Sequence, residues 1–92
     1  MLKIVASTRF KRDLKAAIRR GYPVKRLQIV VDMLAAREPL PAQYRDHCLS
    51  GELHNFRECH VEPDWLLIYR VKEDVLELFL YRTGTHADLF DL

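Results

Sequence analysis

Apolar residues in the first part of the chain recur at two different spacings. Residues 2–6 form a short, continuous apolar run that predicts a strand, and Ser7 or Thr8 then offers a hydroxyl group to cap a helix. The next apolar positions follow helical spacing, and they are Phe10, Leu14, Ala17 and Ile18. We expect this helix to end at Gly21, because glycine is common just after the last helical turn.

A second helix is predicted after Pro23, because proline is tolerated at the start of a helix and not in its interior. One face of this helix is apolar and consists of Val24, Leu27, Val30, Val31 and Leu34. Pro39 and Pro41 prevent it from continuing past Arg37. Two helices separated by so short a turn predict a helical hairpin.

After a proline-containing loop, the pattern becomes that of a sheet. Residues 53–61 mix apolar and polar positions as a half-exposed strand does, and Pro63 separates this strand from the next one. Residues 65–83 are dense in aromatic and β-branched side chains on either side of a polar turn at residues 72–74. They therefore predict an antiparallel hairpin at the centre of the sheet.

The end of the chain predicts a last helical turn over residues 87–90, which Thr85 can cap. The complete order indicates an α+β fold, with the N-terminal helical hairpin packed on one face of a small antiparallel-centred sheet. With 92 residues, the chain is expected to form a single domain, residues 1–92. A domain of this size has no separate lid, so any active site must be open or shallow.

Charge is distributed unevenly, although the net charge is only +2. Residues 1–37 carry ten Lys or Arg and two Asp, whereas residues 38–92 carry five Lys or Arg and eleven acidic residues. A basic surface of this kind binds polyanions, because clustered Lys and Arg release counterions from phosphates. Two solvated amphipathic helices would give the same composition, so the charge pattern alone leaves both interpretations open.

Several classes of protein are not favoured by the sequence. No apolar run approaches the ~20 residues that span a bilayer. Arg9 interrupts the apolar start of the chain too early for a signal peptide, so we expect a cytoplasmic protein without a membrane partner. Cys48 and Cys59 are expected to be reduced thiols. Each is adjacent to a histidine, His47 or His60, and neither pair has the spacing of zinc ligands.

The second half carries a set of groups suited to cleaving RNA. Attack by the RNA's own 2′-hydroxyl group needs a base, an acid for the leaving 5′-oxygen and positive charge for the phosphorane. Imidazole serves both proton roles, since its reference pKa is about 6.5. We expect three histidines on loops and strand ends to converge with a carboxylate and a guanidinium, namely His47, His60, His86, Asp64 and Arg82.

Each of these residues also has a purely structural interpretation. Arg82 can contact phosphate or form a salt bridge with a neighbouring carboxylate, and Asp64 can orient an imidazole or cap a turn. The apolar run that contains Trp65 favours a position in the core. Phe90 is less easily explained by burial and can stack on an RNA base, and His54 is expected on the surface.

Two segments resemble a known family. YRDHCLSGELHNFRECHVEPDWLLIYR and LYRTGTHADLF, which lie within residues 44–90, resemble the YafQ-type branch of the RelE superfamily of bacterial toxins. Residues 1–43 agree with that branch only in layout, with a strand and a basic helical hairpin. The resemblance implies a RelE-like fold.

The resemblance also implies a function. Members of this branch are mRNA interferases of type II toxin-antitoxin pairs, which cut translated mRNA in the ribosomal A site and are inhibited by an antitoxin. The implied partners are a cognate antitoxin, the 70S ribosome and mRNA, and the implied products carry 2′,3′-cyclic phosphate and 5′-hydroxyl ends without a metal or other cofactor.

The site residues that the resemblance implies are all retained in this chain. The catalytic positions are His47, His60, Asp64, Arg82 and His86, and the substrate-binding positions are Trp65 and Phe90. We assign His86 as the general acid and Arg82 as the group that stabilises the phosphorane. His47, His60 and Asp64 share the base and orienting roles, and the division among them stays open.

Two other functions are compatible with parts of the sequence. The helical hairpin can be interpreted as a DNA-binding helix-turn-helix, supported only by Lys25, Arg26 and Gln28. RelE-like scaffolds also occur in ParE-type toxins, which bind and inhibit gyrase. Neither alternative accounts for the three histidines.

Overall fold

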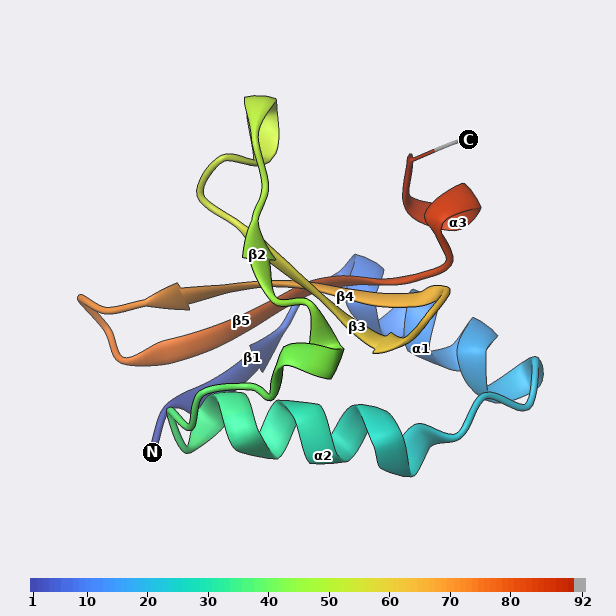
Figure 1. Ribbon diagram of the computed structural model, residues 1–92, viewed down its shortest axis with the longest axis horizontal. Helices are drawn as coiled ribbons and strands as arrows, with labels where there is room; N and C mark the ends of the chain where they lie inside the picture. The colour runs from blue at the N-terminus through green and yellow to red at the C-terminus, as the bar shows by residue number, and fades with distance from the viewer. Residues whose placement is uncertain (91–92) are drawn as a thin grey trace.

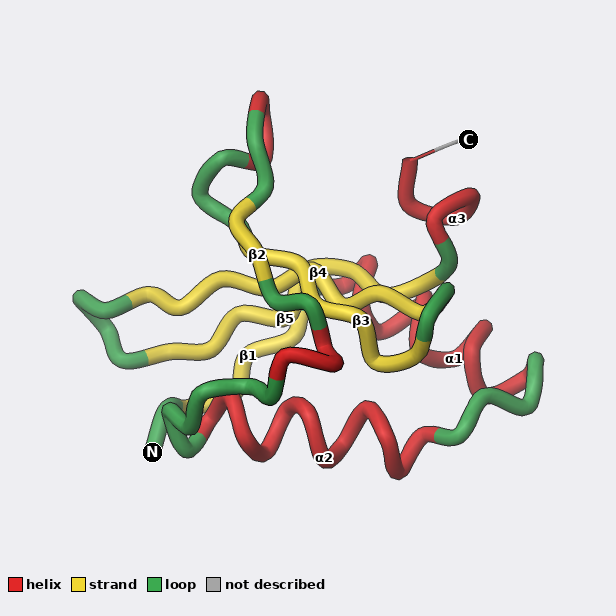
Figure 2. The backbone as a smooth tube through the Cα atoms, viewed as in Figure 1, coloured by secondary structure: helices red, strands yellow, loops and turns green. Residues whose placement is uncertain are grey.

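The computed structural model describes residues 1–90, and its helices and strands form two layers (Figures 1 and 2). In chain order the elements are β1 (Lys3–Ala6), α1 (Thr8–Arg19), α2 (Val24–Ala35), the 3₁₀ turn η1 (Ala42–Tyr44), β2 (His47–Cys48), the 3₁₀ turn η2 (Gly51–Leu53), β3 (Arg57–Glu62), β4 (Trp65–Lys72), β5 (Glu77–Gly84) and α3 (His86–Phe90). This order confirms the α+β class.

The strands form one sheet with the order β1-β5-β4-β3-β2. The hairpin of β4 and β5 is antiparallel, as are the pairs of β3 with β4 and of β2 with β3, whereas β1 lies parallel to β5. The predicted central hairpin is therefore confirmed. Because β1 and β2 lie at opposite edges of the sheet, the helical hairpin between them carries the chain across the whole sheet.

The helical hairpin covers one face of the sheet. The core contains Phe10 and Ala17 of α1 and Leu27, Val30 and Val31 of α2, and it is completed by alternate residues of the central strands, which are Cys59, Val61, Trp65, Leu67, Tyr69, Leu78 and Leu80. Alternate residues of a strand point to one face, so this layer holds both helices on the same side. Figure 1 shows α2 along that side. The segment that contains η2 projects from the opposite side of the sheet, and so does α3.

The predicted helix ends have identifiable physical causes. Ser7 caps α1, since its hydroxyl oxygen accepts a hydrogen bond of 2.9 Å from the backbone N–H of Phe10. Gly21 adopts φ +80° just beyond α1, a conformation that glycine adopts without steric cost. The second helix ends at Ala35, two residues earlier than predicted, because Arg37 has the left-handed φ of 60°.

Two details of the sheet differ from the sequence prediction. The strand predicted over residues 53–61 begins only at Arg57, because residues 51–53 form η2 and the backbone N–H of Phe56 bonds back to the carbonyl of Leu53 at 2.8 Å. The short strand β2 was not predicted. It pairs His47 with Glu58 and Cys48 with Arg57, and two residues are too few to show an alternating pattern.

Within residues 1–90, no helix has both the length and the apolar character needed to cross a membrane.

Candidate active site

Three imidazoles lie close together on the sheet face opposite the helices. His47 comes from β2, His60 from β3 and His86 from the first turn of α3. The ring centroids of His47 and His60 are 6.4 Å apart, and those of His60 and His86 are 5.7 Å apart. The expected convergence of the three histidines is therefore present in the fold, with His60 in the middle.

Each of the three rings is held through its Nδ1 atom by an oxygen acceptor. Nδ1 of His47 lies 2.7 Å from the carbonyl oxygen of Arg45, and Nδ1 of His60 lies 3.2 Å from that of Pro63. Nδ1 of His86 lies 2.6 Å from Oδ1 of Asp64. Because these oxygens can only accept, each Nδ1 donates. Nε2 of His60 and His86 is left to exchange a proton with a substrate, whereas Nε2 of His47 faces a carboxylate of the sheet.

Asp64 holds His86 by two hydrogen bonds. Besides the ring contact, Oδ1 of Asp64 accepts the backbone N–H of His86 at 3.0 Å. The hydrogen bond from the backbone N–H lowers the pKa of Asp64 most, and the bond from the ring lowers it further. The exposed carboxyl group therefore stays ionised near neutral pH. Of the two interpretations of Asp64 from the sequence, the orientation of an imidazole agrees with this geometry.

Glu58 is a site residue that the sequence analysis missed. Its side chain is only 6% exposed, and its Oε1 lies 3.5 Å from Nε2 of His47. Its second oxygen is buried and has no hydrogen-bond partner among residues 1–90. Because the contact depends on the pairing of β2 with β3, only the identification of His47–Cys48 as a strand could have pointed to Glu58.

Arg82 forms a salt bridge with a carboxylate on α1. Its Nε and Nη2 atoms each donate to Asp13 at 3.0 Å, and the same carboxylate accepts the backbone N–H of Thr83 at 3.1 Å. The hydrogen bonds to Asp13 raise the pKa of Arg82. The salt-bridge interpretation of Arg82 is confirmed, and contact with phosphate stays a prediction.

The two aromatic residues differ in exposure. Trp65 is 2% exposed and packs edge-on against Tyr22, with ring centroids 5.1 Å apart. The core position favoured by the sequence is confirmed, and the contact of Trp65 with substrate stays a prediction. Phe90 of α3 is 36% exposed and lies four residues beyond His86, so it remains available for stacking.

Helix α3 is tied to the helical layer by Asp88. Nη1 and Nη2 of Arg20 donate to its carboxylate at 2.6 and 3.2 Å, and Asp88 also exchanges two hydrogen bonds of 3.0 Å with Thr85. A Cβ atom at Gly84 would lie 2.9 Å from Cβ of Asp88, so only glycine allows this approach. These contacts hold the element that carries both His86 and Phe90.

The remaining predicted groups lie outside this cluster. Cys48 is exposed and Cys59 is buried, and both are free thiols, as expected; burial raises the pKa of Cys59 to about 12. His54 is exposed. In the described part of the chain, no three His, Cys, Asp or Glu side chains lie close enough together to hold a metal ion.

Comparisons with known proteins match nearly the whole chain to one family. Residues 2–91 match the family model described as the bacterial toxin YafQ of type II toxin-antitoxin systems. The mRNA interferase toxin YafQ of Escherichia coli K12 is 41% identical over 85 residues, which cover 91% of this chain and 90% of that protein.

Solved structures agree in fold and in length. The metal-bound toxin of Helicobacter pylori is 47% identical with a TM-score of 0.93, and the match covers 98% of this chain and 100% of that one. A chain of the E. coli DinJ-YafQ complex is 40% identical with a TM-score of 0.89, over 98% of this chain and 99% of that one. The chain therefore belongs to the YafQ family of bacterial toxins of type II toxin-antitoxin systems.

Proposed function

We propose that this toxin is a ribosome-dependent mRNA interferase, an endoribonuclease that cleaves translated mRNA in the ribosomal A site and so inhibits translation. The observation that carries the proposal is the cluster of His47, His60 and His86, with Asp64 bonded to the last of them. The curated E. coli relative is named an mRNA interferase toxin, which supports the same activity.

The proposed reaction uses the 2′-hydroxyl group of the RNA as nucleophile. His60, or His47 once its Nε2 turns away from Glu58, accepts the 2′-hydroxyl proton through Nε2, and the 2′-oxygen attacks the neighbouring phosphorus. The bond from phosphorus to the 5′-oxygen then breaks, and His86 gives its proton to that oxygen. The products carry a 2′,3′-cyclic phosphate and a 5′-hydroxyl end.

Asp64 and Glu58 act on the imidazoles and not on the substrate. The Asp64 carboxylate fixes the ring of His86 through Nδ1 and leaves Nε2 to face the substrate, which suits His86 as the general acid. On this basis we propose an orienting role for Asp64 and the base role for His47 or His60. Glu58 contacts the other ring nitrogen, Nε2, of His47, from the buried side of the site.

Arg82 is proposed to stabilise the phosphorane. Asp13 takes the donors at Nε and Nη2, so a phosphate oxygen would be met by Nη1. The salt bridge holds the guanidinium beside α1, so this contact requires Nη1 to reach the phosphate from the helix side of the sheet. No metal or cofactor takes part in the proposed steps.

The ribosome supplies what the open site lacks. Residues Arg12, Lys15 and Arg19 are exposed on α1 and are proposed to bind ribosomal RNA, while the histidines face the mRNA. The decoding centre then holds the RNA in line for attack. This function implies a cytoplasmic toxin, and its second partner is the cognate antitoxin of the type II system.

The deciding experiment compares programmed 70S ribosomes with naked mRNA. Antitoxin-free protein is added to each, and the RNA ends are mapped and their chemistry determined. We expect in-frame cuts with cyclic phosphate ends only in the presence of ribosomes, and loss of these cuts with His86→Ala. No cleavage in either reaction would refute the proposal and favour gyrase or DNA binding.

A further inference from the structure

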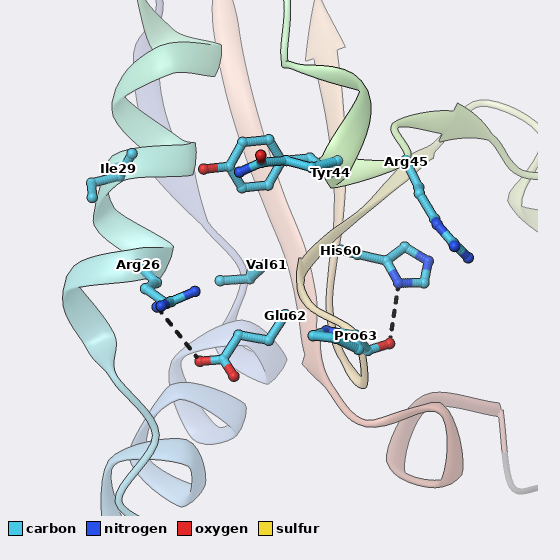
Figure 3. A pocket seen from close by; sticks show the side chains of 9 residues that line it. Arg26, Ile29, Tyr44, Arg45, His60, Val61, Glu62 and Pro63 are labelled. Carbon is cyan, nitrogen blue, oxygen red and sulfur yellow. Dashed lines mark hydrogen bonds and ion pairs between the residues drawn. The ribbon is translucent and has the colours of Figure 1, made fainter.

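A cavity of about 580 Å³ opens beside the histidine cluster (Figure 3). It lies between α2, the segment that contains η1, and the end of β3, and its polar lining residues are Arg26, Gln43, Tyr44, Arg45, His60 and Glu62. Its volume falls in the range of sites that bind small molecules, about 300 to 1,000 Å³. A nucleobase with its ribose fits into such a space.

The cavity and the histidine cluster share His60. Its ring lines the cavity and also lies 5.7 Å from the ring of His86, measured between centroids. Figure 3 shows the His60 ring at one side of the cavity, with Nδ1 turned to the carbonyl of Pro63. A nucleotide whose phosphate reaches the histidines therefore has its neighbouring base within reach of this cavity.

The lining matches the chemistry of a nucleobase. Tyr44 supplies an aromatic ring for stacking, and Arg26 and Glu62, whose charged groups are 3.9 Å apart, place a donor and an acceptor side by side. Gln43 adds an amide with both functions. Donor and acceptor pairs of this kind distinguish base edges, and aromatic rings stack on any base.

The chain segment that forms one wall of the cavity continues directly into His47 and is held by hydrogen bonds. Asp46 accepts hydrogen bonds from the hydroxyl group of Tyr69 at 2.5 Å and from Nη2 of Arg57 at 3.0 Å. Arg45 has a left-handed backbone with φ 47°, and its carbonyl oxygen is the one that holds His47. One segment thus orients the catalytic ring and places Tyr44 and Arg45 at the cavity.

We propose that this cavity receives the base of a nucleotide next to the scissile phosphate, and that Arg26, Gln43, Tyr44 and Glu62 determine which base is accepted. The inference rests on the proposed ribonuclease function and adds to it a preference for particular bases, together with the structural origin of that preference. RNA is favoured over an antitoxin segment because two guanidinium groups, a tyrosine ring and a site histidine line the same space.

The test measures the distribution of cut sites and not activity alone. Wild type, Arg26→Gln, Glu62→Gln and Tyr44→Leu are incubated with ribosomes translating an mRNA library with one randomised codon, and the cut ends are sequenced. Lys25→Gln is the matched control, since it removes a positive charge from the same helix and Lys25 is exposed outside the cavity lining.

We expect the ratio between preferred and disfavoured bases at one position to fall by about tenfold in the three cavity variants. The control should keep the wild-type distribution. If wild type cuts the library and the cavity variants give the same base distribution, the inference is wrong. No cleavage by wild type would instead refute the underlying ribonuclease function.

Discussion

Asp64 accepts two hydrogen bonds from His86, one from the backbone N–H at 3.0 Å and one from the ring at 2.6 Å. The two bonds do different things. The backbone bond attaches the start of α3 to the turn between β3 and β4, and the ring bond sets the orientation and tautomer of the imidazole. A single carboxylate therefore couples the position of α3 to the state of the proposed general acid.

Replacing Asp64 by asparagine should lower the cleavage rate by about 10- to 100-fold, because the amide keeps the shape and loses the carboxylate that fixes the tautomer and orientation of His86. Single-turnover cleavage on ribosomes measures the effect. Asp74→Asn, at an exposed turn, is the matched control. An unchanged rate would show that Asp64 is not coupled to the reaction.

Glu58→Gln should reduce cleavage without destabilising the fold. The buried carboxylate has one oxygen near His47 and another without a hydrogen-bond partner within residues 1–90, so removing the charge relieves an unfavourable burial. Thermal unfolding and ribosome-dependent cleavage should be measured on the same preparation. A parallel loss of stability and activity would indicate a purely structural role for Glu58.

Asp88→Ala should release α3 and reduce cleavage while leaving the rest of the domain folded. The change removes the bidentate contact with Arg20 and the capping bonds with Thr85, whereas the core contains no residue of α3. Hydrogen exchange should rise over residues 85–90 alone. Protection there at the wild-type level would contradict this account of how α3 is held.

The same carboxylate gives a pH dependence of stability. The hydrogen bond from Arg20, followed by the one from Thr85, lowers the pKa of Asp88 well below its ordinary value. The contribution of the Asp88 carboxylate to the free energy of unfolding is therefore complete above about pH 4. It declines as the pH falls toward and through the lowered pKa of Asp88 in the folded protein. Between about pH 5 and pH 2 the melting temperature of wild type should fall more steeply than that of Asp88→Asn. Equal slopes would exclude this contribution.

Reversal of Arg12, Lys15 and Arg19 to glutamate should weaken ribosome binding and reduce its salt dependence. Removing one ion pair with a phosphate lowers the slope of log affinity against log salt by about one. All three side chains are exposed on α1, so circular dichroism should show an intact fold. If binding and its salt dependence both stay unchanged, α1 does not face ribosomal RNA.

Local patterns along the chain were enough to predict most elements and the residue types of the site. The hydroxyl cap at Ser7, the helical spacing after it and the glycine at position 21 act within a few residues, so helix α1 was predictable. The β4-β5 hairpin was predictable for the same reason, since its two strands are adjacent in sequence. Histidine, aspartate and arginine at particular positions indicated phosphoryl transfer before any geometry was known.

The sequence by itself therefore determined the fold class, the helix ends near Ser7 and Gly21, and the identity of the chemical groups, because these depend on short-range propensities and composition. Only the tertiary structure decided which groups meet. The contacts of Glu58 with His47, of Asp13 with Arg82 and of Arg20 with Asp88 join residues that are 11, 69 and 68 positions apart, and these separations are bridged by strand pairing and helix packing. The same packing buried Trp65 and formed the cavity beside His60, because the volume and shape between packed elements depend on all of them together.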